Sequence, residues 1–393
     1  MSSQTAQQTL RKLGKSFASF FELKKQGRRA SIPKYIKKSE LFTIIFQKDS
    51  FKIVNKRIRL SVGKEMKKQL KEKKRQPYIY IKNHHNINQK ISQIEIVPKH
   101  NGRWFTVNYI YEKITDVPIP EPTSISNFAA IDPGELNLAT IYCANENVRP
   151  LIISGKELKN LNNKTKYSIK GLQKKHKKYS DEAYKVWEKR ENKILNYLHI
   201  ASSQVIKYCL NNNVTKLVIG YNKNWKNKIS MGKRNNGKFY QIPFRRFINM
   251  IFYKGLDNGI KIVETNESYT SKCDALNNED VGYHSSYSGT RTKRGLFSSA
   301  TGEEINADIN GAINILRKYI NHYHGEFAES LKNIVSRMYQ MIKSPIKTGI
   351  VIKTCSKSTG RRLVDSCTQG VFRGCDCPQD QITSSTDDSA MSS

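Results

Sequence analysis

From about residue 119 onwards, short apolar runs alternate with stretches of helical periodicity, and this alternation limits the fold more than any other feature of the sequence. Five apolar runs have the length and composition of strands, and they lie at residues 128–131, 138–142, 150–153, 216–219 and 260–263. Helical spacing of apolar residues marks residues 167–211 and 308–320. Because alternating strands and helices are typical of a layered α/β fold, we expect an α/β domain over residues 119–325.

The rest of the chain differs from this core in composition. Residues 1–38 place apolar side chains at helical spacing on a basic surface, which predicts a helical segment. Residues 39–118 carry short β-rich runs that predict a small β-barrel or sandwich, and the proline-rich stretch 118–122 marks the boundary after it. Residues 326–354 are expected to form a C-terminal helix, and the polar residues 355–393 a disordered tail.

The charge balance indicates a polyanionic partner. The chain has 68 Lys and Arg against 33 Asp and Glu, a formal net charge of +35, which is far more than solubility requires. Nucleic acid and an anionic membrane surface are the two candidates. The sequence shows no run of eighteen apolar residues, no secretory leader pattern and no lipidation motif. We therefore expect nucleic acid as the partner, and no membrane.

Two aspartates stand where a sheet edge and a helix start are predicted. Asp132 ends the first apolar run and precedes Pro133-Gly134, which would hold its carboxylate at the sheet edge; a plain Asp-Pro-Gly turn is the alternative. Asp308 begins the later helix, where an acid often serves only as a cap or dipole partner. The small residues Gly311 and Ala312 after it would let another element approach the helix closely, which a cap does not need.

Three sequence blocks together resemble the three RuvC motifs of TnpB proteins, in the same order. They lie at residues 131–139, 268–273 and 306–316. TnpB proteins are RNA-guided nucleases encoded by bacterial insertion sequences and related to eukaryotic Fanzor proteins. The resemblance extends over residues 5–320. It implies that residues 119–325 form an RNase H-like (RuvC) nuclease domain, with an insert at 272–305, and that residues 1–38 are a truncated helical recognition segment.

The second acid of the family pattern is displaced in this chain. Most relatives carry a glutamate at the end of the strand that here finishes with Gly220, which has no side chain to bind a metal. Some TnpB and Fanzor branches carry a glutamate just before the Tyr-Thr-Ser block instead, and the matching residue here is Glu267, with Glu264 as a less favoured neighbour. A solvated loop acid is the alternative. The resemblance thus implies a catalytic, metal-binding set of Asp132, Glu267 and Asp308.

Three carboxylates suit hard divalent cations, because Mg²⁺ prefers oxygen ligands. We expect two Mg²⁺ ions, with Mn²⁺ as a substitute, which together activate water and stabilise the leaving oxygen of a phosphodiester. No zinc is expected. Many relatives carry two Cys-x-x-Cys pairs between the second and third motifs, whereas residues 272–307 offer only Cys273 and His284, too few for a tetrahedral site.

Several basic and aromatic residues near these motifs are predicted to bind nucleic acid. Three of them lie in the insert, where a solvated loop is the alternative. The other three follow the strand that ends at Gly220. Among these, Trp225 equally suits a packing role at the edge of the core. The predicted residues are Arg291, Lys293, Arg294, Trp225, Lys226 and Arg245.

The resemblance implies an RNA-guided DNA endonuclease of a transposable element, with a guide RNA and target double-stranded DNA as partners. The chain starts inside what resembles the recognition segment, and the opening β-strand of relatives is expected to be absent. The alternative is therefore a truncated or repurposed nucleic-acid-binding protein without nuclease activity. A simpler RNase H-like enzyme acting on unguided substrates is a third possibility. We expect the protein in the cytoplasm at the nucleoid, or in the nucleus of a eukaryotic host.

Overall fold

The chain divides into two compact units, one with Met1–Ile114 and the other with Thr115–Val364. Each unit is described by itself below. The computed structural model describes residues 2–35, 40–54, 57–82, 91–113, 117–176, 180–222, 242–293 and 295–350.

The first unit combines one long helix with two small sheets. Helix α1 (Ser3–Lys25) is capped by Ser2, whose side chain accepts a hydrogen bond from the amide of Thr5. One antiparallel sheet has the order β1 (Ile44–Gln47), β5 (Ile91–Lys99), β6 (Trp104–Tyr111). The other has the order β2 (Phe51–Val54), β3 (Arg57–Leu60), β4 (Ile79–Lys82), with α2 (Lys64–Glu72) between β3 and β4 in the chain.

Both sheets contribute to a single small core, which includes Phe46, Ile58, Leu60 and Ile94. The β-rich character predicted for residues 39–118 is therefore confirmed. A closed barrel is not confirmed, because the strands described in this unit hydrogen-bond as two separate sheets.

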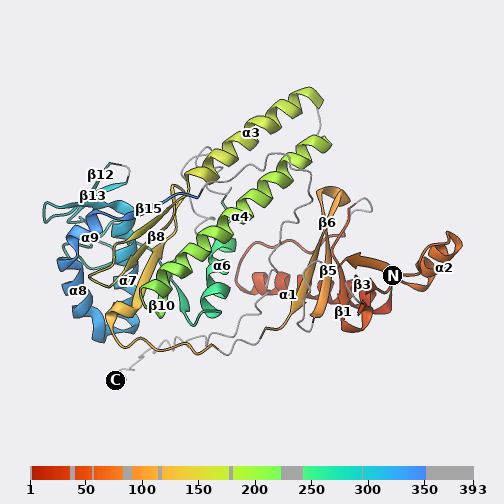
Figure 1. Ribbon diagram of the computed structural model, residues 1–393, viewed down its shortest axis with the longest axis horizontal. Coiled ribbons are helices and arrows are strands. Elements are labelled where there is room, and N and C mark those ends of the chain that lie inside the picture. Colours follow the sequence, from red (N-terminus) through yellow and green to blue (C-terminus); the bar gives the residue numbers. More distant parts are fainter. Residues whose placement is uncertain are drawn as a thin grey trace, which may run out of the picture. The chain divides into compact units, whose positions relative to one another are not determined.

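The second unit is built on a six-stranded mixed sheet (Figure 1). Its order is β11 (Lys261–Thr265), β10 (Lys216–Gly220), β7 (Phe128–Asp132), β8 (Asn137–Cys143), β9 (Leu151–Ser154), β15 (Ile346–Thr348). Strand β8 runs antiparallel to β7 and β9, whereas β10 and β11 run parallel to β7. The five predicted strands are confirmed, and β15 adds a sixth, parallel to β9.

Helices cover both faces of this sheet, and the alternation of side chains along β7 decides what each residue meets. One face packs on α4 (Asp181–Asn211) and α6 (Phe244–Leu256), and it receives Ala129 and Ile131. The other packs on α7 (Ala307–Tyr323) and α8 (Ala328–Arg337), and it receives Phe128 and Ala130. Because neighbouring residues of a strand face opposite sides, Asp132 lies on the α7 face.

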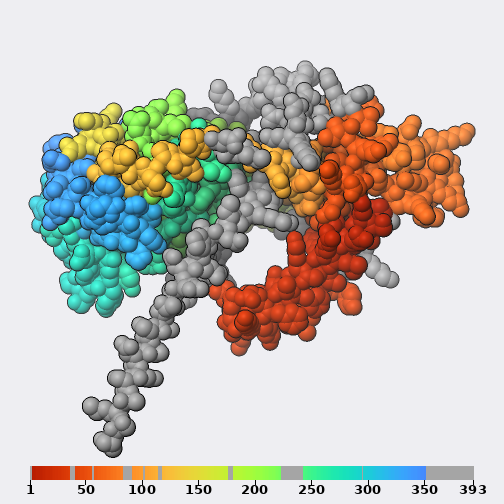
Figure 2. Space-filling model, turned by 90° about the horizontal axis from the view of Figure 1, so that it is seen from below, coloured from red at the N-terminus to blue at the C-terminus, as the bar shows by residue number. Residues whose placement is uncertain are grey.

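The insert between Glu267 and α7 contains a small antiparallel sheet. Its strands are β12 (Thr290–Lys293), β13 (Leu296–Ser298) and β14 (Glu304–Asn306). Phe297 on β13 is 1% exposed and belongs to the same core cluster as α7. In Figure 2 the insert (cyan) and the C-terminal helices (blue) lie next to each other, in agreement with the contact of α9 (Tyr339–Lys343) with β14.

Two helix predictions were wrong. The single helix expected over 167–211 is two helices, α3 (Lys156–His176) and α4, which pack against each other. Ser180 starts α4, because its side chain accepts a hydrogen bond from the amide of Ala183. Of the single helix expected over 326–354, the described residues up to 350 form α8, α9 and then β15; α9 ends before Pro345, which cannot continue a helix. The tail prediction for 355–393 lies outside the described residues.

None of the helices in the described ranges combines the length and the apolar character that a membrane crossing requires.

The burial of Phe297 predicts that it anchors the insert. Phe297→Ala should lower the free energy of unfolding of the second unit by about 3–5 kcal/mol, since it removes a buried aromatic side chain from a packed cluster. Urea denaturation of the full chain, followed by tryptophan fluorescence and circular dichroism, measures this. Tyr167→Ala is the matched control, because Tyr167 on α3 is 73% exposed. Equal losses for both variants would contradict the anchoring role.

Candidate active site

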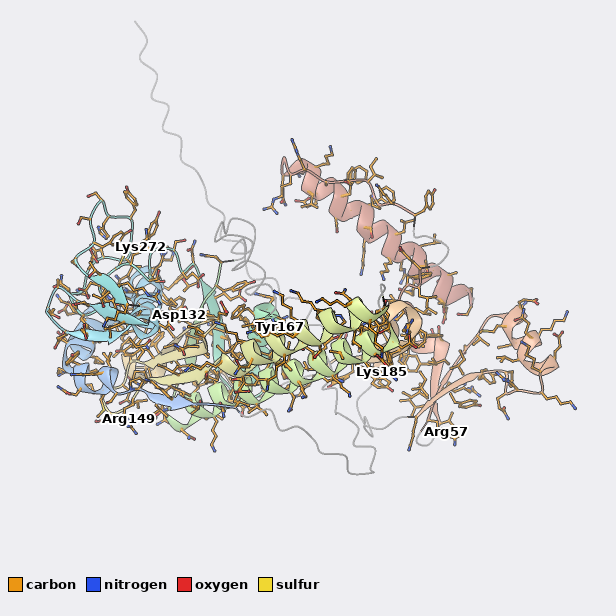
Figure 3. The ribbon with its side chains drawn as sticks, turned by 90° about the horizontal axis from the view of Figure 1, so that it is seen from above. Arg57, Asp132, Arg149, Tyr167, Lys185 and Lys272 are labelled. Carbon is orange, nitrogen blue, oxygen red and sulfur yellow. The ribbon has the colours of Figure 1, made fainter. Side chains whose placement is uncertain are left out.

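Asp132 lies at the end of β7, against helix α7. A Cβ added to Gly311 would lie 2.6 Å from Oδ2 of Asp132, so a side chain at 311 would displace the carboxylate or the helix. The close approach that Gly311 was expected to permit is therefore made by Asp132 itself. Figure 3 shows Asp132 toward the insert that carries Lys272, whereas Arg149, which precedes β9, lies at the opposite end of the strands.

Asp308 lies in the first turn of α7, but its side chain does not cap the helix. The cap is Asn306, whose Oδ1 accepts hydrogen bonds from the amides of Asp308 at 2.9 Å and Ile309 at 3.3 Å. The Asp308 carboxylate instead accepts a 2.7 Å hydrogen bond from Nδ2 of Asn137 at the start of β8. It also forms an ion pair with Arg291 on β12, with 3.7 Å between Oδ1 and Nη2. Its carboxylate is thus turned toward the sheet edge.

Glu267 fills space that the missing side chain of Gly220 leaves free. Ile219 pairs with Ile131, so Gly220 is the next position on β10, beside Asp132 on β7. A Cβ on Gly220 would lie 3.3 Å from Cβ of Glu267 and would collide with Ile315 of α7. The loss of the side chain at 220 and the placement of Glu267 are therefore two parts of one packing arrangement.

A tight turn holds Glu267, and Glu264 lies elsewhere. The carbonyl of Glu267 accepts hydrogen bonds from the hydroxyl of Thr270 at 2.8 Å and from its amide at 3.3 Å. Glu264 lies two residues after Ile262 on β11 and therefore on the same face, and Ile262 packs in the α4 and α6 cluster. Its carboxylate forms an ion pair with Arg245 at the start of α6. Glu264 therefore faces away from Asp132.

The acids oppose one another's ionisation. Burial raises the pKa of the Asp132 carboxyl well above its usual range; the charges of Asp308 and Glu267 raise it further, while Arg291 lowers it. Burial also raises the pKa of Glu267 to about 7. A partly buried group of like charges is destabilised at neutral pH, and a bound divalent cation relieves such repulsion.

The fit to Mg²⁺ rests on this donor set. In the described part of the chain, no three acidic, histidine or cysteine side chains stand close enough to form a complete metal-binding group. Mg²⁺ needs no such cage, since it keeps several waters and binds through one or two carboxylates together with substrate phosphate oxygens. Acids that share one sheet edge and act on each other's charge fit that mode of binding.

The other residues predicted to bind nucleic acid lie in different local environments. Arg291 and Lys293 lie on the exposed strand β12. Arg245 pairs with Glu264 and lies over the ring of Tyr221, 5.7 Å from its centroid. Trp225, Lys226 and Arg294 lie outside the described residues. Their roles in binding nucleic acid remain predictions.

Asn137 and the Arg291–Asp308 ion pair were not predicted, because Asn137 lies 171 positions before its partner in the chain.

A hydrogen-bond network of buried polar groups organises the insert. Oδ2 of the buried Asp274 accepts hydrogen bonds from the hydroxyl of Ser299 at 2.7 Å and from the amide of Ala300 at 2.8 Å. Burial raises the pKa of the Cys273 thiol, which donates to the carbonyl of Gly282. Two asparagines of α7 extend the network, since Asn310 and Asn314 both donate to the carbonyl of Cys273.

Comparison with known proteins places this geometry in a family context. Residues 108–226 match the family model OrfB_IS605, described as "Probable transposase", and residues 244–315 match the model "Cas12f1-like, TNB domain". The TnpB-like protein ORF457 of Acidianus two-tailed virus is 26% identical over 154 residues, which cover 39% of this chain and 31% of that protein. The match therefore spans about a third of that curated relative.

Two solved structures show a weaker likeness. One, described as a Cas12f1–sgRNA–target DNA complex, is 17% identical with a TM-score of 0.37, and the match covers 75% of this chain and 74% of that one. The other, a CRISPR-Cas12f ternary complex, is 16% identical with a TM-score of 0.35, over 76% and 67% of the two chains. At these TM-scores the likeness supports no argument about this fold. The two family models, which follow each other along the chain, and the TnpB-like relative support a TnpB-type protein.

Proposed function

We propose that the chain is an RNA-guided DNA endonuclease of a transposable element, with a RuvC-like nuclease domain over residues 119–325. Asp132, Glu267 and Asp308 are its catalytic residues. The observation that carries this proposal is the packing of Glu267 against Gly220, beside Asp132. A solvated loop acid has no reason to occupy that space or to have its pKa raised by burial.

In this proposal Asp132, Glu267 and Asp308 would share two Mg²⁺ ions, or Mn²⁺ in their place, with waters and substrate phosphate oxygens as the remaining ligands. The ions would supply water activation and stabilisation of the leaving 3′ oxygen of a phosphodiester. The surrounding residues orient the acids. Asn137 holds the Asp308 carboxylate through its 2.7 Å hydrogen bond, and Gly311 leaves room for the carboxylate of Asp132. Arg291 places a positive charge beside Asp308, where a substrate phosphate would approach.

The proposed partners are a guide RNA and a target DNA duplex. The formal net charge of +35 supports a large polyanionic partner. The family matches support a nuclease related to transposable elements. In this class of enzyme, base pairing with the guide selects the target, and the protein contacts mainly the backbone.

The assignment of Glu267 predicts opposite outcomes for two glutamates three residues apart. Glu267→Gln should reduce Mg²⁺-dependent cleavage by about 10³-fold or more, because a lost metal ligand is worth several kcal/mol of transition-state stabilisation. Glu264→Gln is the matched control and should retain cleavage within a few-fold, since Glu264 pairs with Arg245 on the other face of the sheet. Purified chain with its co-purified RNA is assayed on DNA matched to that RNA.

Equal cleavage by the Glu267→Gln variant and the wild type would overturn the assignment. Specific RNA binding without cleavage of matched DNA by the wild type would favour a repurposed nucleic-acid-binding protein instead.

The raised pKa values predict that the acids destabilise the metal-free protein at neutral pH. A free glutamate ionises near pH 4.5, whereas Glu267 in the folded protein ionises near 7. The contribution of protonated Glu267 to the stability of the folded protein is therefore fully present below pH 4.5, and it is lost as the pH rises through 7. At pH 8 without divalent ions, Asp132→Asn and Glu267→Gln should each raise the Tm by a few degrees, since each kcal/mol shifts the Tm by about 2–4 °C.

Differential scanning fluorimetry at pH 8 and pH 4.5 measures this effect. The difference between variant and wild type should be smaller at pH 4.5 than at pH 8, and added Mg²⁺ should raise the Tm of the wild type more than that of either variant. A variant that is less stable than the wild type at pH 8 would contradict the electrostatic account.

A further inference from the structure

A cavity of about 280 Å³ lies at the same sheet edge as the acids, displaced from them toward the far strands. Asp132 ends β7, and Asn137, which lines the cavity, begins the antiparallel β8. Ser154 and Thr348, at the ends of β9 and β15, also line it. Figure 1 shows the end of β15 beside the start of α3, which contributes Lys156 to the cavity wall.

The lining of this cavity contains positive charge and no carboxylate. Lys156 and Lys347 are among its residues, and within the described ranges neither ammonium group has an acidic partner. Lys159, one turn further along α3, instead pairs with Glu135 at 3.6 Å. Asparagine amides and hydroxyl groups complete the polar lining. Unpaired lysines with neutral donors around them are the groups that bind a phosphate.

Two cavity residues are also the residues that hold Asp308. Asn137 donates to the Asp308 carboxylate, and Asn306 caps the first turn of α7, on which Asp308 lies. The cationic cavity therefore begins one side chain away from the anionic group. A nucleic-acid strand repeats its phosphate at every nucleotide. A strand with one phosphate at the acids would thus place another within reach of this cavity.

We propose that this cavity is a subsite for a backbone phosphate of the DNA strand being cut, next to the scissile phosphate. Lys156 and Lys347 neutralise that phosphate. The volume lies just below the range of about 300–1,000 Å³ that is usual for small-molecule pockets, which suits one nucleotide of a single strand and not a duplex. The proposal rests on the proposed function for the identity of the strand.

Lysine footprinting of the full chain tests the subsite without any need for cleavage. The protein is acetylated in Ca²⁺ with and without a short single-stranded oligodeoxynucleotide, and each lysine is quantified by mass spectrometry. The oligonucleotide should slow acetylation of Lys156 and Lys347 several-fold. Lys166 is the matched control, since it is exposed on the same helix, about 15 Å further along at 1.5 Å per residue. An oligonucleotide with uncharged methylphosphonate linkages should protect neither cavity lysine, because it lacks the phosphate charge.

Cleavage assays then separate substrate binding from chemistry. The double variant Lys156→Gln/Lys347→Gln should raise KM about ten-fold or more with kcat within a few-fold of wild type, whereas Lys166→Gln should change neither. In direct binding, each lost phosphate contact should reduce the salt dependence of log K by about 0.7.

Unchanged acetylation of Lys156 and Lys347, or equal protection of Lys166, would overturn the subsite. Protection by the methylphosphonate oligonucleotide would also overturn it, because the bound group would then not be a phosphate. If both cavity lysines are protected but matched DNA is never cut, the subsite holds and the proposed nuclease function falls. If matched DNA is cut but neither cavity lysine is protected, the proposed nuclease function holds and the subsite falls.

Discussion

Helix α7 lies so close to the ends of β7 and β10 that neither facing glycine has room for a side chain. Gly311 on the helix meets the carboxylate of Asp132, and Gly220 on the strand meets Ile315 and Glu267. This contact brings together acids from distant parts of the chain, since Asp132 and Asp308 lie 176 positions apart. The geometry of the site, the burial of its carboxylates and their mutual repulsion all depend on it.

The insert is tied to the same helix by buried polar groups. Asn310 and Asn314, both fully buried, donate to backbone carbonyls of the turn that follows Glu267. Nη1 of Arg317 donates to Oδ1 of Asn314 and to the carbonyl of Glu279. These three buried side chains all donate to acceptors, which satisfies the requirement for polar groups removed from water. One face of α7 thereby positions Asp308, the Glu267 turn and the insert together.

The charge pattern around the sheet edge changes sign over a short distance. The three acids share one end of the central strands, while the adjoining cavity contains Lys156 and Lys347 and no acid. Asn137 lies between the two regions and belongs to both. An anionic site that attracts cations beside a cationic site that attracts phosphates is the arrangement expected where a polyanionic strand is bound and cut.

The sequence by itself determined the α/β character, the strands β7 to β11 and the start of α7, because burial on two faces and helical spacing leave clear local patterns. It also indicated Asp132 and Asp308 from their positions at a strand end and a helix start. Local patterns did not reveal the break between α3 and α4, and β15 was missed because an edge strand of three residues carries too weak a signal.

Only the tertiary structure shows which way Glu267 and Glu264 face. Glu264 lies within β11, on the face where it pairs with Arg245, whereas Glu267 lies two residues past the end of that strand, in the space that Gly220 leaves open. The same holds for Asn137, whose partner Asp308 lies 171 positions further along the chain, and for Lys156 and Lys347, which line one cavity although they come from distant parts of the chain. Residue types and spacing describe one segment at a time, whereas these contacts arise only when α7, β15 and the insert pack around one edge of the sheet.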